Sequence, residues 1–139
     1  MQDQHPAPLP TPPFSTVALP LEPTVTAPDG SDVRVLAGVR GGSMAHFALA
    51  PGRCSAAVQH KTVEELWYVL SGEAQMWRCQ GEREEVVTLT AGVSLSIPQG
   101  TRFQFKAVGS TPFAAVGVTM PPWPGPDEAE LVAGPWQAC

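Results

Sequence analysis

The sequence predicts an all-β domain whose strands pair antiparallel in a sandwich or barrel. Short runs rich in Val, Leu, Phe, Trp and Thr recur at roughly 8–12-residue intervals, and turn residues separate them. No segment between these runs repeats with the period of an α-helix. The chain also contains 16 prolines and 13 glycines, which excludes a bundle of long helices because both residue types disfavour helix interiors.

The expected strands follow the apolar runs in chain order. Glycine-containing breaks such as Gly41-Gly42, Ser71-Gly72 and Gln99-Gly100 bound them and are typical of tight turns. The expected strands are Val33–Val39, Met44–Ala50, Ser55–His60, Leu66–Leu70, Ala74–Arg78, Glu85–Leu89, Ser94–Ile97, Arg102–Ala107 and Ala114–Thr119.

The two ends of the chain differ from this central part. Half of the prolines fall in residues 1–28, so residues 1–30 are expected to form an extended proline-rich arm. Residues 31–120 are expected to form the barrel. Residues 121–139 combine a second proline-rich stretch with Trp123 and Trp136, which predicts a tail packed on the barrel, where it covers apolar surface.

Charge and composition exclude several classes of function. Lys and Arg number 8 against 13 Asp and Glu, which gives a net charge of −5 and argues against nucleic-acid partners and anionic membranes. No apolar run approaches the roughly 20 residues that span a bilayer, and the first residues do not resemble a secretion signal. The three cysteines form no close pair, so free thiols in a reducing cytoplasm are expected.

Two motifs carry a resemblance to a known family. In the first, Gly52, His60, Glu65 and Gly72 stand at the spacing of the first cupin motif, with position 58 as its other histidine place. In the second, Gly92, Pro98 and Gly100 match, with positions 103 and 107 as the histidine and asparagine places. The chain is therefore similar to a small single-domain cupin. This resemblance implies a jelly-roll barrel.

The departures from the cupin motifs bear on metal binding. A usual cupin holds a divalent metal at four places, which here are Val58, His60, Glu65 and Phe103. Because two donors make a poor cage, no cofactor is expected, the alternative being a weakly bound divalent metal. If a metal does bind, its expected ligands are His60, Glu65 and His46, the last only if its strand face turns inward.

His60 and Glu65 are the expected catalytic pair. The resemblance places them in a barrel lined by Val58, Trp67, Val69, Phe103 and Phe105. Burial there opposes charge while each group favours the charged form of the other, so His60 is expected to titrate near neutrality. Metal-free cupins that act as epimerases resemble this arrangement.

The sequence thus leaves three functions open. The favoured one is a metal-independent or weakly metal-assisted isomerase, lyase or cyclase acting on a small, mostly apolar organic molecule. The alternatives are a ligand-binding cupin without chemistry and a metal-dependent cupin oxygenase. Arg78 and Arg102 are either solvated or able to pair a substrate carboxylate. The resemblance also implies a homodimer, formed through an outer sheet or the proline-rich arm.

Overall fold

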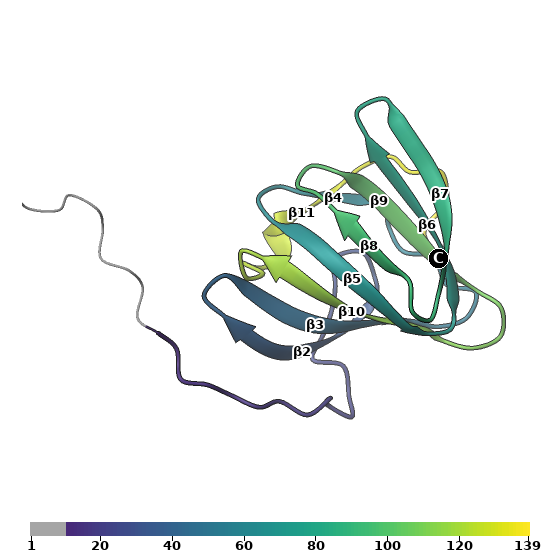
Figure 1. The fold of residues 1–139 in the computed structure, drawn as a ribbon. Coiled ribbons are helices and arrows are strands. Elements are labelled where there is room, and N and C mark those ends of the chain that lie inside the picture. The colour runs from purple at the N-terminus through teal and green to yellow at the C-terminus, as the bar shows by residue number, and fades with distance from the viewer. Residues whose placement is uncertain (1–10) are drawn as a thin grey trace, which may run out of the picture.

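The computed structural model describes residues 11–139, which form two antiparallel β-sheets facing each other (Figure 1). The first sheet has the order β1 (Val25–Thr26), β2 (Asp32–Val39), β3 (Gly42–Leu49), β10 (Phe113–Met120), β5 (Glu64–Ser71) and β8 (Ser94–Ile97). The second has the order β11 (Ala129–Leu131), β4 (Val58–His60), β9 (Arg102–Val108), β6 (Glu73–Gln80) and β7 (Arg83–Thr90). The predicted all-β jelly-roll class is confirmed. Residues 1–10 of the predicted arm lie outside the described part.

All nine expected strands are present, with some changes at their ends. The run Ser55–His60 pairs as a strand only over Val58–His60, because Ser55 and Ala56 donate instead to the carbonyls of Phe105 and Asp29. Two strands were not predicted: β1 is only two residues long, and β11 is a partly polar triplet after the one-turn helix Pro126–Glu128. Neither has the apolar alternation that marks a buried strand.

The barrel interior is filled by alternate residues of both sheets. The core contains Leu49, Val58, Trp67, Val69, Met76, Leu89, Leu95, Ile97, Phe103, Phe105 and Phe113. Trp67 is at its centre, stacked on Phe47 with ring centroids 5.1 Å apart and edge-on to Phe105 at 5.1 Å. Gly117 faces these rings, and a Cβ there would meet Phe47 Cε2 at 2.6 Å. A glycine is therefore needed for the stacked pair.

One end of the barrel is polar on the inside. Register places Ser43 beside Thr119, and Thr119 beside Glu65, in the six-stranded sheet. In the facing sheet Val58 pairs with Phe103 and Gln59 with Arg102. One residue further along, His60 lies opposite Thr101, and both side chains point into the barrel as Val58 and Phe103 do. We call these five residues, Ser43, Thr119, Glu65, His60 and Thr101, the polar end layer.

A segment after the last long strand covers this end. Residues 121–131, called here the C-terminal strap, begin at the polar end layer, where the Trp123 amide donates to Ser43 Oγ at 3.0 Å. The strap ends in β11, which pairs with β4. Its Glu128 carboxylate accepts hydrogen bonds from the amides of Thr62 and Val63 and from the Thr62 hydroxyl. The strap therefore joins both sheets across the barrel mouth.

The rest of the tail lies on the five-stranded sheet. The buried Gln104 amide donates to the Trp136 carbonyl at 2.7 Å and accepts from the Trp136 amide at 3.1 Å. Cys54 and Cys139 exchange two backbone hydrogen bonds, both of 3.1 Å. No helix in residues 11–139 is long and apolar enough to cross a membrane.

Candidate functional site

His60 and Glu65 are brought together by the short connection between β4 and β5. His60 is the last residue of β4, and Glu65 is the second residue of β5. The strands belong to different sheets, so the connection carries the chain across the barrel mouth and both side chains point inward. Only 6% of His60 and 5% of Glu65 is exposed, so both groups are buried.

Glu65 is oriented by a tryptophan on its own strand. Trp67 Nε1 donates to Glu65 Oε2 at 2.6 Å, because residues two apart on a strand share one face. The second carboxyl oxygen, Oε1, lies 3.5 Å from His60 Nδ1. Nδ1 is buried and makes no hydrogen bond. One oxygen is therefore fixed and the other faces the imidazole across a narrow gap.

Burial shifts the two groups in opposite directions. It lowers the pKa of His60 to about 4, which the Glu128 carboxylate only partly opposes. It raises the pKa of Glu65 to about 7, although the hydrogen bond from Trp67 opposes the rise. The prediction that His60 titrates near neutrality is wrong: the carboxyl group does so, and the imidazole is neutral there. At mildly acidic pH the pair holds one proton, on Glu65.

Aromatic rings enclose the imidazole from two sides. Phe103 meets His60 edge-on with centroids 5.3 Å apart, and Trp123 of the strap does so at 5.2 Å. Glu128, on the same strap, has a pKa below its usual range, because burial is outweighed by the hydrogen bonds from Thr62 and Val63. The strap thus supplies a cover and a negative charge to the site.

The five expected lining residues all lie in the core beside the pair. Val58, Trp67, Val69, Phe103 and Phe105 are at most 3% exposed and belong to one packed cluster. Their side chains fill the barrel beneath His60 and Glu65. The pair therefore sits on an apolar floor, and a substrate has to approach from the strap side.

The donor set does not fit the metal that the cupin motifs imply. Val58 and Phe103 occupy two ligand places with apolar groups, and the Phe103 ring packs against His60. Within residues 11–139 no group of three or more His, Cys, Asp or Glu side chains could hold a metal ion. His46 lies opposite Arg34 and Val116, on the face away from Phe47, which packs on Trp67. His46 thus faces outward and does not join the pair.

The two arginines considered from the sequence point to opposite faces. Arg102 lies between Thr101 and Phe103, both inward and buried, so its exposed side chain is on the outer face. Arg78 pairs with Phe103 and therefore faces the barrel side, where it lines a pocket at the mouth with Thr101. The sequence predicted Trp123 only as part of a tail packed on the barrel, and it contained no signal for Glu128 or Thr101. The roles of all three residues depend on contacts between distant segments.

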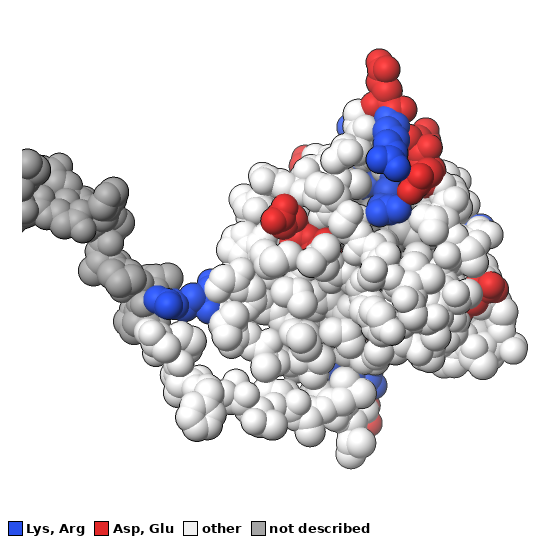
Figure 2. Space-filling view, in the orientation of Figure 1, with Lys and Arg blue, Asp and Glu red and all other residues white. Residues whose placement is uncertain are grey.

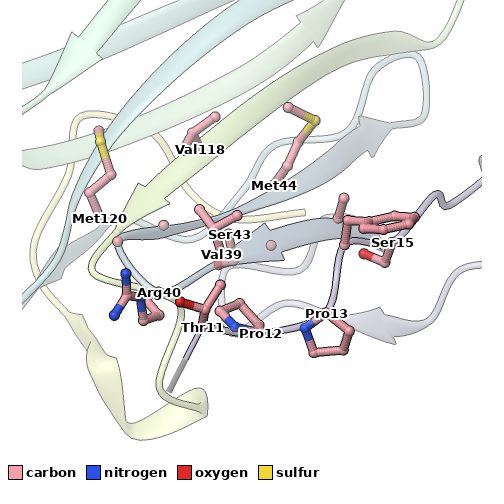
Figure 3. Close-up of a pocket in the computed structure, with 15 residues that line it drawn as sticks. Thr11, Pro12, Pro13, Ser15, Val39, Arg40, Ser43, Met44, Val118 and Met120 are labelled. Atoms are coloured by element: carbon pink, nitrogen blue, oxygen red, sulfur yellow. The ribbon is translucent and has the colours of Figure 1, made fainter. Parts of the chain in front are cut away.

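A larger groove lies away from this pair. It has a volume of about 790 Å³ between residues 11–15 of the arm and the turn joining β2 to β3 (Figure 3). Met44, Val118 and Met120 line its sheet side. Neither His60 nor Glu65 borders it, so this groove is not part of the site.

Comparisons with known proteins agree with this architecture. The family model described as "Cupin domain" matches residues 45–119. An uncharacterized conserved protein with a double-stranded beta-helix domain from Klebsiella pneumoniae is 23% identical, with a TM-score of 0.61 over 75% of this chain and 85% of that chain. None of the curated proteins compared with the chain matches it.

Two further solved structures show how widely this fold is used. Oxalate decarboxylase from Bacillus subtilis, described with Mn(II) centres, is 18% identical with a TM-score of 0.61, over 70% of this chain and 27% of that chain. The CENP-C cupin domain of Drosophila melanogaster is 18% identical with a TM-score of 0.58, over 66% of each chain. At such identities the likeness shows the fold alone.

Proposed function

Because the chain belongs to the cupin domain family, as its two motifs predicted, we propose that it uses the barrel mouth to move protons on a small organic molecule. The observation that carries this proposal is the buried pair of His60 and Glu65, whose Nδ1 and Oε1 atoms lie 3.5 Å apart. A neutral imidazole is a base and a protonated carboxyl group is an acid. Opposite shifts of two adjacent groups are typical of acid–base sites.

The pair can relocate a proton without any cofactor. Neutral His60, with its own proton on Nε2, takes a proton at Nδ1 from an acidic C–H or O–H of the substrate. Protonated Glu65 delivers its proton from Oε1 to a neighbouring substrate atom. His60 then carries the proton and Glu65 is ionised, so the proton crosses the 3.5 Å gap from Nδ1 to Oε1 and restores the starting state. The substrate gains and loses one proton, which is the balance of an isomerisation. Lyase and cyclase reactions use the same two transfers.

The apolar floor supports this role. Phe103, Trp67 and Val58 keep water from the pair, which maintains the opposed pKa shifts. Trp67 keeps Glu65 Oε1 directed at the imidazole by holding Oε2. Entry of a substrate requires the strap to move, because Trp123 lies over His60.

The test is proton exchange on small enolisable ketones and aldehydes in D₂O, followed by NMR. We expect wild-type protein to exchange the acidic C–H of at least one compound, H60A to abolish the exchange, and E65Q to slow it by about 10²–10⁴-fold. E64Q is the matched control, because Glu64 is adjacent, exposed and directed to the outer face. Exchange that survives H60A would overturn the assignment.

The two alternatives predict other results. A ligand-binding cupin without chemistry would bind a compound through this mouth without exchanging its protons. An oxygenase would require metal, and the apolar groups at Val58 and Phe103 count against it. The acid–base function is favoured over both because the opposed pKa shifts place a base beside an acid, which proton transfer requires and simple binding does not.

A further inference from the structure

We propose that a second pocket at the barrel mouth binds the carboxylate of a small molecule and so defines the substrate class of the neighbouring pair. This inference rests on the proposed function and deepens it. The pocket has a volume of about 260 Å³ and is lined by Arg78, Gln80, Arg83, Glu85, Ser96 and Thr101, together with one proline.

The strand register places this pocket inside the mouth. Arg78 pairs with Phe103 on one side and Glu85 on the other, so all three side chains lie on the barrel side of the five-stranded sheet. Gln80 pairs with Arg83 two residues closer to the turn between β6 and β7, so these two side chains lie on the same face of the sheet. Figure 2 shows acidic and basic side chains side by side over this end of β6 and β7. The pocket is thus the charged part of the mouth.

Two donors in the pocket have no partner. Thr101 is 2% exposed, and its Oγ1 makes no hydrogen bond. Arg78 Nε is also buried and unbonded, while Nη1 donates to the Ser96 carbonyl and Nη2 to Glu85 Oε1, both at 2.8 Å. Buried polar groups are normally paired, so such groups in one pocket wall indicate a site for an acceptor.

The charge of the pocket favours an anion. Arg78 and Arg83 contribute two positive charges and Glu85 one negative charge, which leaves a net charge of +1. Glu85 already demonstrates the preferred partner, because its carboxylate binds Arg78 at 2.8 Å and lies 3.7 Å from Arg83. A carboxylate is a planar monoanion whose two oxygens match the two free donors, Arg78 Nε and Thr101 Oγ1, and whose charge matches the net charge of the pocket. A phosphate dianion would keep one negative charge and at least one oxygen without a partner. Gln80 and Arg83 lie exposed at the rim, where an anion enters.

The pocket adjoins the acid–base pair. His60 and Glu65 do not line this pocket, but Thr101, which does, lies opposite His60 in the register of β4 and β9. The Gly100 amide also donates to the His60 carbonyl at 3.2 Å. Ser96 precedes Ile97, which pairs with Glu65. Neighbouring strands lie about 5 Å apart, so Thr101 is close to His60, whereas Arg78 lies one strand further away on β6. A carboxylate bound between Arg78 and Thr101 therefore directs the rest of the molecule toward the pair. The substrate class is therefore a small organic acid with an acidic proton near its carboxylate.

The test is an NMR titration of the full chain with sodium acetate, and separately with sodium phosphate, at constant ionic strength. We expect acetate to shift the amides around Arg78, Ser96 and Thr101 in a saturable way and to bind more tightly than phosphate. R78Q should weaken acetate binding by about 10-fold or more, which is the usual effect of losing a charged hydrogen bond. T101V should weaken it several-fold, and T101S, which keeps the hydroxyl, should restore it.

R102Q is the matched control, because Arg102 is the neighbour of Thr101 on the outer face. It should bind acetate like the wild type, whereas equal weakening in R102Q and R78Q would show general electrostatics and overturn the proposal. T101V should not lower the melting temperature, since the hydroxyl that it removes has no partner. A lack of saturable shifts, or tighter binding of phosphate, would also overturn it. H60A should bind acetate normally, so loss of exchange in that variant tests the proposed function separately.

Discussion

His60 Nδ1 faces Glu65 Oε1 across 3.5 Å at the polar end of the barrel, and burial makes the neutral forms of both the stable ones. In the unfolded chain near pH 5.5 the imidazole carries the proton and the carboxyl group does not. In the folded chain the proton is on Glu65. Folding thus transfers one proton between two residues without net uptake or release, and this has a measurable consequence.

Stability should depend little on the pair between pH 4.5 and 6.5, because two slopes cancel. Because the pKa of Glu65 is raised to about 7, the folded protein binds its proton more tightly than the unfolded chain does. This contribution to the free energy of unfolding is fully present below pH 4.5 and is lost as pH rises toward 7. Because the pKa of His60 is lowered to about 4, its contribution to the free energy of unfolding has the opposite dependence. It is fully present above pH 6.5 and is lost as pH falls toward 4. Urea unfolding of E65Q should reveal the His60 slope alone, roughly tenfold in the folding constant per pH unit.

H60Q should reveal the opposite slope, with stability falling as pH rises from 4.5 to 7. Each variant is compared with wild type at the same pH, so that other titrating groups such as Asp29 and Glu128 contribute equally to both curves. Curves that run parallel to wild type in both variants would contradict the opposed shifts.

Restoring both missing histidines should create a metal site. V58H/F103H supplies the two histidines that usual cupin motifs have and this chain lacks. Val58 and Phe103 pair with each other on the inner face, beside His60 and Glu65. We expect calorimetry to show tight Zn²⁺ binding by this variant, since four ligands suit a closed zinc site. F103H also removes a packed ring, so a loss of about 3 kcal/mol of stability without metal is expected.

The matched control is Q59H/R102H, which places two imidazoles on the outer face of the same strand pair. It should bind Zn²⁺ far more weakly, because neither His60 nor Glu65 is within reach. Equal affinity of the two variants would show that the barrel interior does not form the site.

The strands and turns of the barrel could be predicted from the sequence more fully than the C-terminal strap that covers its mouth. Gly52 and Gly72 have φ of 78° and 75°, and a Cβ at Gly72 would collide with the backbone at Pro112, so the motif glycines are demanded by the backbone itself. The approach of His60 to Glu65 also follows from the short connection between their strands.

The protonation of the pair and the role of the strap could not be predicted in the same way. Trp123 reaches His60 from more than sixty residues away, through an irregular segment without periodicity. The sign of the His60 shift depends on how completely that segment and Phe103 bury the ring. Local spacing contains no measure of this burial.

Removing the Glu128 carboxylate should loosen the strap. In E128A the Val63 amide, which is fully buried, loses its acceptor, as do the amide and hydroxyl of Thr62. We expect a loss of about 1–3 kcal/mol and faster hydrogen exchange in residues 61–63 and 121–131. Because the Glu128 pKa is lowered by folding, its contribution is present above pH 4.5 and is lost as pH falls below it.

E130A is the control for the strap, because Glu130 lies on the same segment but is exposed. Its carboxylate accepts a hydrogen bond from Gln59 Nε2 at 3.1 Å. It should leave exchange in residues 61–63 unchanged. Protection that persists there in E128A would show that the strap is held by β11 and Trp123 alone.

The outer face of the six-stranded sheet is expected to form a homodimer. Met44, Leu66, Tyr68, Leu70, Val116 and Val118 make an outer apolar face on β3, β10 and β5, and charged side chains are sparse over these strands (Figure 2). Leu66 and Tyr68 are 54% and 53% exposed. Single monomers rarely leave so continuous an apolar surface in water.

The arm suggests that a second copy of the chain covers this face. Arg34 on β2 donates to the carbonyls of Pro20 and Leu21, which fixes the arm beside the outer apolar face. From there it leaves the body, with Phe14 fully exposed and Leu21 94% exposed (Figure 1). The groove lined by Met44, Val118 and Met120 continues the face toward the arm (Figure 3). An isologous pair would cover both faces and both arms at once.

Light scattering coupled to size-exclusion chromatography measures the outcome directly. Wild-type protein should elute with twice the chain mass of 14.7 kDa, and L66K and Y68K should elute as monomers, because each places a charge in the middle of the interface. V86K is the matched control, since Val86 is 53% exposed but lies on β7 of the other sheet. It should remain a dimer. A wild-type monomer at high micromolar concentration, or a dimer that survives both L66K and Y68K, would show that the outer apolar face has another use.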